Sequence, residues 1–308
     1  MTSNKTIRIG TRESALALYQ AKEVQRQLHE KGFQTEIVEI TSDGDIDLKT
    51  PLYEMGIQGI FTKSLDIALL QNRIDIAVHS AKDIPTKLAK GLTISAILKR
   101  GTIHDCLVLP SGVKSFEAVS TKKIASSSLR RRSQWLHRYP KHQMENLRGN
   151  IQTRLKKLNE SDWSGAIFAQ TALERLEIKS HTYITLDWML PAPAQGAMAA
   201  VCRADDKAMF ETCSAINHNE TNICVTAERD FLAALQGGCA VPIAANAIIK
   251  NDQIHFKGNI FSLDGKDKCE VEKVFSPDQS SQVGKLAAQE ILSVGGDSIL
   301  KTFRQISK

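Results

Sequence analysis

Short apolar runs alternate with amphipathic helical patterns along the first third of the chain. Strand-type runs lie at Ile7 to Gly10 and at Thr35 to Thr41, and the apolar residues between them recur at helical spacing through Leu16, Leu18, Ala21, Val24 and Leu28. A helix near Ser64 to Gln71 then precedes the continuous apolar run Ile74 to Val78. Such a run is typical of a strand buried on both faces, so the order predicts α/β units on a largely parallel sheet.

The alternation resumes after residue 103 and predicts a second α/β domain. Its expected elements are a strand at Cys106 to Leu109, a strand before Ser126, helices near Leu129 to Tyr139 and Ile151 to Leu158, and a strand at Gly165 to Ala169. A further strand at Ala197 to Cys202 follows Pro191 and Pro193. Because the second unit is already complete at that point, we expect this strand to return to the first sheet.

From Val241 onward the pattern changes to that of a small antiparallel sheet covered by a helix. Strands are expected at Ile243 to Lys250 and Gln253 to Phe261, joined near Asn251-Asp252, and at Glu270 to Phe275, before a helix from about Gln282 to Leu292. The 308 residues, 42% hydrophobic, suffice for two or three cored domains. We predict domain 1 over 1–98 with 197–217, domain 2 over 103–193 and domain 3 over 220–308.

Composition argues against several classes of protein. The six cysteines are scattered without a CxxC pair, and the eight histidines form no HxxxH or HExxH pair, so neither a disulfide framework nor a metal site is expected. Most of the cysteines are expected to be small buried residues. The N-terminus lacks an apolar stretch for a signal peptide or membrane span, which predicts a cytosolic protein. The net charge of +6 is compatible with anionic ligands, but with 6% aromatic residues and none beside the basic run, nucleic-acid binding is not favoured.

Cationic side chains gather where loops meet helices. They are Arg12 after the first strand, Lys82 after the Ile74 strand, Arg130, Arg131 and Arg132 after Ser126-Ser127-Ser128, then Arg148 and Arg154. Loops at the carboxyl ends of strands line the ligand crevice of open α/β sheets, so these groups are candidates to converge from two domains. Arginine forms paired hydrogen bonds with planar anions, which indicates a carboxylate or phosphate site.

Two of these segments have a structural interpretation beside the functional one. Ser126-Ser127-Ser128 offers hydroxyls and free backbone N–H groups at a helix start, but on its own it is better explained as a helix cap followed by arginines on a solvated face. His79 to Pro85 is expected as a loop at the sheet edge, with Pro85 holding Ile84 extended. Asp83 there suits acid/base work if cationic neighbours keep it ionised, whereas the usual meaning of Lys-Asp is a weak exposed ion pair.

Gln236-Gly237-Gly238-Cys239 follows a helix built on Thr226 to Leu235. The two glycines allow a left-handed cap and close approach of another group, which presents Cys239 on a tight loop. No histidine is near in sequence to activate the thiol, so covalent tethering is a sharper hypothesis than a protease nucleophile, with a structural cysteine as the ordinary alternative. The tract 56–61 contains two glycines outside any dinucleotide-loop context and is predicted to be a mobile surface loop.

Five motifs, in order and correctly spaced, resemble the porphobilinogen deaminase family. They are Gly10 to Ser14 with Leu16-Ala17-Leu18, His79 to Pro85, Ser127 to Arg131, Leu147 to Asn150 with Thr153-Arg154, and Gly237-Gly238-Cys239 with Val241-Pro242. The resemblance implies an α/β fold of two domains similar to periplasmic binding proteins, hinged together, plus a small C-terminal α+β domain with an antiparallel sheet. It also implies a dipyrromethane cofactor, made from the enzyme's own substrate and joined to Cys239 by a thioether.

The activity that this resemblance implies is that of a transferase, hydroxymethylbilane synthase, of tetrapyrrole and heme biosynthesis. Porphobilinogen loses ammonia to give an azafulvene, the terminal pyrrole of the chain attacks it, and after four cycles water releases the linear tetrapyrrole. The implied partners are porphobilinogen and the growing pyrrole chain, with no nucleic acid, no membrane and a monomeric state. The alternative from another class is a non-catalytic two-lobed anion-binding protein, which gives no reason for the Cys239 loop.

The resemblance also assigns roles to individual residues. Asp83 is the expected catalytic residue, because its carboxylate can accept pyrrole N–H hydrogen bonds and stabilise the cationic azafulvene. The expected cofactor-binding residues are Cys239, Lys82, Ser80, Asp83, Ser127, Ser128, Arg130, Arg131 and Arg154. The expected substrate-binding residues are Arg12, Ser14, Gln20, Ser126, Arg148, Arg175 and Gln195.

The chain departs from the family's pattern at several positions. Gln58, in the expected mobile loop with Phe61, stands where a lysine is common, and Lys63 or Lys49 is a candidate to replace that charge. Ser126 replaces a threonine and keeps the hydroxyl. Four positions where the family has glycine are occupied by larger residues, namely Ala125, Gln152, Ala172 and Ala194. The changes at these four positions remove no titratable group. Cys239 and Asp83 are both present, so an active enzyme is expected.

Overall fold

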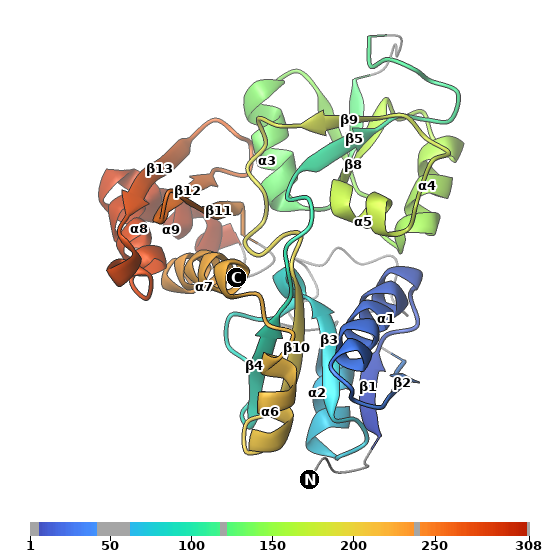
Figure 1. Cartoon of the computed structure of the whole chain (residues 1–308). Coiled ribbons are helices and arrows are strands. Elements are labelled where there is room, and N and C mark those ends of the chain that lie inside the picture. The colour runs from blue at the N-terminus through green and yellow to red at the C-terminus, as the bar shows by residue number, and fades with distance from the viewer. Residues whose placement is uncertain (1–5, 42–61, 118–121, 237–240, 307–308) are drawn as a thin grey trace. The chain divides into compact units, whose positions relative to one another are not determined.

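The computed structural model describes residues 6–41, 62–117, 122–236 and 241–306 (Figure 1). These residues group into two compact units, which are described one at a time. Unit 1 contains the described residues up to 101 together with 196–222, and unit 2 contains 102–195 and the residues from 223 onward. Within the described ranges, no helix is long and apolar enough to cross a membrane.

Unit 1 is built on a five-stranded mixed sheet. Its strands lie in the order β2 (Thr35–Glu39), β1 (Ile7–Thr11), β3 (Ile76–Ser80), β10 (Met198–Arg203) and β4 (Leu92–Ile97). The predicted return of the later strand to this sheet is confirmed, because β10 pairs with both β3 and β4. The prediction of a largely parallel sheet is wrong for that half, since both pairings are antiparallel. A strand that arrives from elsewhere in the chain, without a helical crossover, is not constrained to run parallel.

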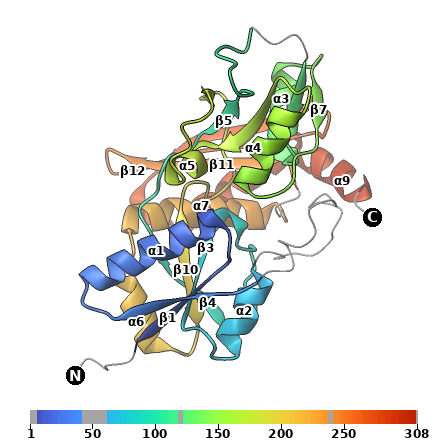
Figure 2. The ribbon, with the colours of Figure 1, turned by 90° about the vertical axis from the view of Figure 1, so that its right-hand side faces the viewer.

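Helices cover both faces of the first sheet. On one face α1 (Ala15–Glu30) and α6 (Lys207–Ser214) pack against the strands, and α2 (Lys63–Leu70) lies on the other face (Figure 2). The core beneath α1 joins Val24 and Leu28 to Ile9 of β1. The predicted buried face of α1 is confirmed for Ala21, Val24 and Leu28, whereas Leu16 and Leu18 are only half-buried.

The buried carboxylate of Asp75 links strands β1 and β10 of unit 1. Asp75 accepts hydrogen bonds from Arg8 Nε at 2.9 Å and Nη2 at 2.9 Å, and Arg203 Nη2 lies 3.4 Å from the same carboxylate. Arg203 also pairs with Asp206 at 2.8 Å. Because Asp75 is fully buried, these two cations compensate its charge and fix β10 beside the start of β3.

Unit 2 contains a second mixed sheet in the order β7 (Gln143–Glu145), β6 (Lys123–Ala125), β8 (Gly165–Ala169), β5 (Asp105–Val108) and β9 (Tyr183–Leu186). Strand β8 is parallel to β6 and antiparallel to β5. Helix α3 (Leu129–Arg138) packs on one face through Trp135. Helices α4 (Ile151–Glu160) and α5 (Gln170–Arg175) cover the other face, where Leu155, Leu158 and Leu173 are buried.

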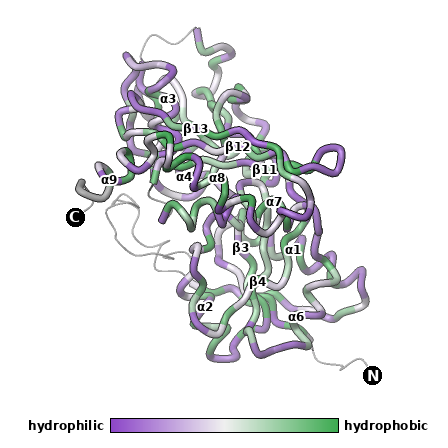
Figure 3. The backbone as a smooth tube through the Cα atoms, turned by 90° about the vertical axis from the view of Figure 1, so that its left-hand side faces the viewer, coloured by the Kyte–Doolittle hydropathy of each residue, from purple (hydrophilic) through white to green (hydrophobic). Residues whose placement is uncertain are grey.

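The third sheet, also in unit 2, is the predicted antiparallel meander. It consists of β11 (Ile243–Lys250), β12 (Gln253–Phe261) and β13 (Lys268–Phe275), and the order along the chain is the order in the sheet. Asn251 and Asp252 both have positive φ values, 51° and 58°, which suit a two-residue hairpin turn. The hydrophobic and hydrophilic residues of the strands can be followed in Figure 3.

Helices cover the core face of the third sheet. They are α7 (Asn219–Ala234), α8 (Val283–Ile291) and α9 (Asp297–Ile306), with a π turn (Leu292–Gly296) between the last two and a 3₁₀ turn (Pro277–Gln279) before α8. Phe231 of α7 and Phe256 of β12 are fully buried there, with ring centroids 5.2 Å apart. Gly258 leaves room for Phe231, since an added Cβ would lie 2.7 Å from its ring.

The segment 190–195 is tied to several elements of unit 2. The carbonyl oxygen of Pro191 accepts a hydrogen bond from Ala245 N at 3.2 Å, and Ala194 N donates to the buried Glu228 of α7 at 2.6 Å. Ala194 has a φ of 64°, a left-handed conformation that favours glycine. The alanine at this position is therefore held in a strained conformation by its hydrogen bond and its burial.

We predict that Ala194→Gly raises the free energy of unfolding by about 0.5–1 kcal/mol, because glycine removes the left-handed strain. Urea unfolding of the two proteins measures this change. Ala192→Gly is the matched control: Ala192 has no positive φ, so glycine there should lower the unfolding free energy or leave it unchanged. Equal destabilisation by both variants would contradict the strain at Ala194.

Candidate functional site

In unit 1, the candidate residues lie at the ends of β1 and β3. The two strands are parallel neighbours, so their carboxyl ends meet at the same edge of the sheet. Arg12 follows β1, and a single 3₁₀ turn, Ala81–Asp83, follows β3. The predicted loop therefore begins later than expected, because His79 and Ser80 are the last residues of β3 and pair with β10. The expected extended conformation of Ile84 is confirmed, with φ −75° and ψ 126°.

Three predicted polar residues come together around the start of α1. Ser14 is the N-cap of the helix, and its side chain accepts a hydrogen bond from Ala17 N at 3.3 Å. Gln20, nearly two turns further along α1 and buried, donates from Nε2 to Ser80 Oγ at 2.8 Å. Lys82 and Asp83 follow immediately and are both half-buried. Hydroxyl, amide, ammonium and carboxylate groups thus share one edge of the first sheet.

His79 is the buried titratable group at this edge. Its Nε2 has no hydrogen-bond partner among the described residues. Burial, together with the nearby positive charge of Arg12, lowers the pKa of His79 to about 3. The imidazole is therefore neutral at physiological pH, so the positive charge at this edge comes from Arg12 and Lys82.

In unit 2, the serines between β6 and α3 have structural partners. Ser127 Oγ donates to the carbonyl oxygen of Leu147 at 3.0 Å and accepts from Leu147 N at 2.8 Å. Ser128 is the N-cap of α3, so the capping role expected of this segment is present. Ser126 is buried, and its Oγ accepts from Ser128 N at 3.3 Å.

The expectation that arginines on a solvated helix face follow this cap is wrong for Arg130 and Arg131. Both are buried, with 5% and 7% of their surface exposed, because a carboxylate that sequence reasoning missed lies between them. Arg130 Nη2 lies 2.7 Å from Asp105 Oδ2, and Arg131 Nη2 lies 2.7 Å from Asp105 Oδ1. Nothing in the apolar pattern of β5 marks Asp105, because it is the first residue of the strand.

The hydrogen bonds around Asp105 hold the two guanidinium groups in place. Arg130 Nη1 donates to the carbonyl oxygen of Leu190 at 2.7 Å, and Arg131 Nη1 donates to that of Ile167 at 3.0 Å. The predicted Gln195 belongs to the same cluster, since its Nε2 donates to Asp105 Oδ1 at 2.9 Å. We call Asp105, Arg130, Arg131 and Gln195 the Asp105 cluster.

The Asp105 cluster has an excess of positive charge. Two guanidinium groups face one carboxylate, so the formal sum is +1. Burial lowers the pKa of Arg130, Asp105 opposes that shift, and Arg131 adds to it. The ordinary pKa of an arginine lies so far above neutrality that the Arg130 guanidinium stays charged despite this shift. Arg130 Nε is buried without a hydrogen-bond partner among the described residues, which leaves one donor of the cluster unused.

Other predicted arginines lie around α4 and α5. Arg148 is buried just before α4, and Arg154 on α4 donates from Nε to the carbonyl oxygen of Gly149 at 2.7 Å. Asn150 caps α4 by accepting from Thr153 N at 2.9 Å. Arg175 is the last residue of α5 and is half-buried. The predicted residues Gln58, Phe61 and Cys239 lie outside the described residues.

Most of the described cysteines are buried, as the sequence predicts. Four of the five are buried: Cys106, Cys202, Cys213 and Cys224. Burial raises the pKa of Cys106 and of Cys213 to about 12, and it also raises the pKa of Cys202 and Cys269. A thiol becomes a nucleophile through its thiolate, so these four are not poised to react. In the described part of the chain, no three His, Cys, Asp or Glu side chains are grouped as ligands for a metal.

The mixed sheets and their buried arginines define an α/β protein suited to holding anionic ligands. Comparisons with known proteins identify the family within this class. The family model for the dipyrromethane cofactor binding domain of porphobilinogen deaminase matches residues 7–211, and the model for the C-terminal domain of porphobilinogen deaminase matches residues 222–293. Together these two regions account for most of the chain.

Curated relatives agree with the family models over nearly the full length. Porphobilinogen deaminase of Carboxydothermus hydrogenoformans is 40% identical over 305 residues, covering 98% of both chains. The protein of that name from Syntrophotalea carbinolica is 38% identical, covering 97% of this chain and 96% of its own. The chloroplastic porphobilinogen deaminase of Oryza sativa is 40% identical, covering 94% of this chain and 84% of its own.

Similarity to solved structures is weaker. A periplasmic binding protein of Salmonella typhimurium with high arginine specificity is 14% identical, with a TM-score of 0.43, covering 71% of this chain and 94% of its own. The assignment to a family rests on the sequence relatives. The chain belongs to the porphobilinogen deaminase family. It is a transferase, a hydroxymethylbilane synthase that condenses porphobilinogen, and dipyrromethane is its cofactor.

We predict that His79 makes the stability of unit 1 sensitive to acid. The unfolded chain binds a proton at this histidine below its ordinary pKa of about 6.5, whereas the folded chain does so only near 3. The unfolded state therefore holds more protons between these values, and stability falls as pH falls through that window. From pH 6.5 to 5 the loss due to His79 is roughly 1.6 kcal/mol.

Urea unfolding of wild type and His79→Leu at pH 7.5, 6.5, 5.5 and 5.0 tests this. The wild-type free energy of unfolding should fall more steeply with acid than that of His79→Leu. His255→Leu, which removes a half-buried histidine of β12, controls for the loss of a histidine as such. Parallel pH curves for wild type and His79→Leu would show that His79 is not the source of the acid sensitivity.

Proposed function

We propose that Cys239 holds the dipyrromethane cofactor through a thioether bond. The support is chemical and positional. Two glycines precede Cys239 in the sequence, and a residue without a side chain allows close approach of another group to the backbone. Four of the described cysteines have a raised pKa through burial, so none of these four has the reactivity that attachment needs.

The Asp105 cluster fits the carboxylates of such a cofactor. Dipyrromethane brings acetate and propionate side chains, and the cluster has a net positive charge with one buried donor, Arg130 Nε, left over. That N–H can donate one charge-assisted hydrogen bond to a carboxylate oxygen. We infer that Ser127, Ser128, Arg130, Arg131 and Arg154 in unit 2, and Ser80, Lys82 and Asp83 in unit 1, bind the cofactor. The cofactor supplies the nucleophilic pyrrole carbon from which the chain is extended.

Asp83 is the proposed catalytic residue. Ammonia loss from porphobilinogen leaves a cation, and a carboxylate about 4 Å away stabilises a unit positive charge by roughly 4 kcal/mol at an effective dielectric of 20. An interaction of that size corresponds to about a thousandfold in rate if it is made chiefly in the transition state. The 3₁₀ turn after β3 supports this role, because it fixes Asp83 at the edge of the sheet beside Lys82.

The remaining polar groups are proposed to bind the carboxylates of porphobilinogen and of the growing chain. In unit 1 these groups are Arg12, Ser14 and Gln20, and in unit 2 they are Ser126, Arg148, Arg175 and Gln195. The amide of Gln195 donates to Asp105 and to the carbonyl oxygen of Ile103, so we infer that it acts through Asp105 and not by direct contact. Gln58 and Phe61 are proposed to belong to a loop that closes over the reaction.

We also propose three domains, a cytoplasmic location and a monomeric state, with no nucleic-acid or membrane partner. The three sheets support the division into 1–98 with 197–217, 103–193 and 220–308. The bacterial relatives named porphobilinogen deaminase support a cytoplasmic enzyme. Light scattering of the purified protein measures its mass in solution, and a dimer mass would contradict the monomer.

The intact mass of the freshly purified, denatured protein tests the covalent cofactor. We expect an excess over the polypeptide mass equal to two deaminated porphobilinogen units in the wild type, and no excess in Cys239→Ser. Cys269→Ser is the matched control, a half-buried cysteine of β13 whose replacement should leave the excess intact. A bare wild-type mass that stays bare after incubation with porphobilinogen would overturn the thioether proposal.

Replacing Asp83 tests its electrostatic role. We predict that Asp83→Asn lowers kcat by roughly a hundred- to a thousandfold, because the amide keeps the size of the side chain and removes its charge. Steady-state kinetics with porphobilinogen measure this. Asp252→Asn, in the exposed turn between β11 and β12, is the control and should keep full activity. A kcat for Asp83→Asn within threefold of the wild type would remove Asp83 from the catalytic step.

A further inference from the structure

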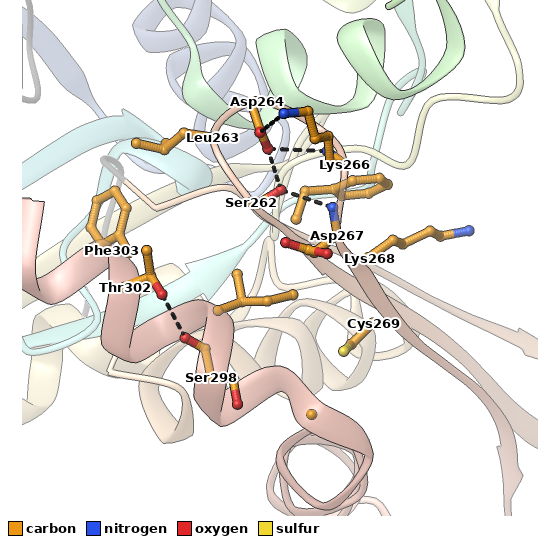
Figure 4. Close-up of a pocket in the computed structure, with 13 residues that line it drawn as sticks. Ser262, Leu263, Asp264, Lys266, Asp267, Lys268, Cys269, Ser298, Thr302 and Phe303 are labelled. Atoms are coloured by element: carbon orange, nitrogen blue, oxygen red, sulfur yellow. Dashed lines mark hydrogen bonds and ion pairs between the residues drawn. The ribbon is translucent and has the colours of Figure 1, made fainter.

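The loop that joins β12 to β13, residues 262–267, is held in one shape by its own hydrogen bonds. Ser262 Oγ donates to Asp264 Oδ1 at 2.6 Å and accepts from Asp267 N at 2.9 Å. Lys266 N donates to Asp264 Oδ1 at 3.1 Å, and the Lys266 ammonium lies 3.2 Å from Asp264 Oδ2 (Figure 4). These bonds hold the pKa of Asp264 at about 2, well below its ordinary value. We call this segment the β12–β13 loop.

Gly265, at the tip of the β12–β13 loop, lies directly against the backbone of α3. A Cβ added to Gly265 would lie 2.5 Å from the carbonyl oxygen of Ser133 and 2.7 Å from the N atom of His137. These two atoms are four residues apart, the spacing of the acceptor and the donor in an α-helical hydrogen bond. The loop therefore contacts the backbone of α3 directly. Gly265 is buried and has a φ of 74°, so both its conformation and its surroundings require glycine.

His137 joins α3 to the same loop by a side-chain contact. Its Nδ1 lies 2.7 Å from the carbonyl oxygen of Gly265. A carbonyl oxygen only accepts, so Nδ1 carries the proton and donates. The ring of His137 also packs edge-on against Phe261, the last residue of β12, with centroids 5.1 Å apart. The third sheet thus contacts α3 through a close backbone approach, a hydrogen bond and a ring contact.

The contact point lies one turn from the Asp105 cluster. Ser133, whose carbonyl oxygen faces Gly265, donates from Oγ to the carbonyl oxygen of Arg130 at 3.2 Å. A movement of α3 at Ser133 is therefore transmitted to Arg130 and Arg131, which must reach Asp105 at 2.7 Å. Buried networks of this kind tolerate little displacement, because each partner that moves leaves a buried charge uncompensated.

We propose that the β12–β13 loop positions α3, so that the third sheet sets the placement of the arginines that bind the pyrrole carboxylates. Gly265 and His137 are positioning residues in this scheme and do not touch the substrate. The inference rests on the proposed function of Arg130 and Arg131. It gives the third sheet a role in substrate binding.

Gly265→Ala tests the proposal, with Gly112→Ala as a matched control. Gly112 has a φ of 81°, close to that of Gly265, but an added Cβ there has nothing within 4 Å. An alanine is therefore strained by the positive φ at both positions, but only the Cβ of Gly265→Ala clashes with the backbone of α3. We expect Gly265→Ala to lower kcat/KM for porphobilinogen at least tenfold relative to Gly112→Ala, since displacements near 1 Å can cost about a hundredfold.

The loss should appear mainly in KM, because carboxylate contacts are made in both the ground state and the transition state. A general loss of stability would instead reduce the amount of active enzyme and leave KM unchanged. Equal KM and kcat values for Gly265→Ala and Gly112→Ala would overturn the proposal. Wild-type protein that lacks activity would instead overturn the proposed function, so the two failures are distinguishable.

His137 variants test the same contact without a steric clash, and they decide the matter if Gly265→Ala fails to fold. His137→Ala should raise KM roughly threefold to tenfold, as expected for loss of one hydrogen bond of about 1 kcal/mol. His137→Asn, whose amide can donate to the Gly265 carbonyl oxygen, should restore most of the wild-type KM. A wild-type KM for His137→Ala, or no rescue by His137→Asn, would contradict positioning through this contact.

Discussion

The pairing of Asp105 with Arg130 and Arg131 is the interaction on which the candidate site of unit 2 depends. Two arginines that start a helix would repel each other and favour solvent if nothing compensated them. The carboxylate of Asp105 compensates their charge inside the protein. Because Asp105 is fully buried, it holds both guanidinium groups at fixed distances. One carboxylate against two cations leaves the cluster positive, so the same pairing that supports the fold of unit 2 also has the charge that suits an anionic ligand.

The same cluster connects elements that are far apart in sequence. Arg130 donates to Leu190, and Gln195 donates to Asp105, so the segment 190–195 is fixed at both ends. Between those ends, Glu228 of α7 accepts from Ala194 N and from Ala247 N of β11. The strain at Ala194 is tolerated because this carboxylate fixes its backbone. The second and third sheets are therefore tied to one another through buried polar contacts as well as through α3.

Local patterns predicted the elements whose signal is local. The hairpin of β11 and β12 was predictable because strand-type runs flank Asn251-Asp252, and α1 was predictable because its apolar residues recur at helical spacing. The antiparallel direction of β10 was not predictable, since nothing within Met198–Arg203 encodes the orientation of its neighbours. Short elements such as β7, with three residues, carry too few positions to show a period.

In the candidate site, too, only the features with a local sequence signal could be predicted. The motifs identified Asp83, Arg130 and Arg131 by residue type, but their surroundings depend on long-range contacts. Asp105 lies 26 positions from Arg131, so no spacing rule connects them. The structural interpretation of Ser128 as a helix cap was right, and the companion interpretation of solvated arginines was wrong, because capping depends on neighbours in sequence and burial does not.

The place of β10 in the first sheet has a consequence for how the chain is made. β10 lies between β3 and β4, yet it is synthesised roughly 100 residues after β4. At about 5–20 residues per second, β3 and β4 wait about 5–20 s on the ribosome with their pairing edges open. Open strand edges invite pairing with other chains. The unit that begins first is thus completed late, and its strand edges stay open to other chains until β10 arrives.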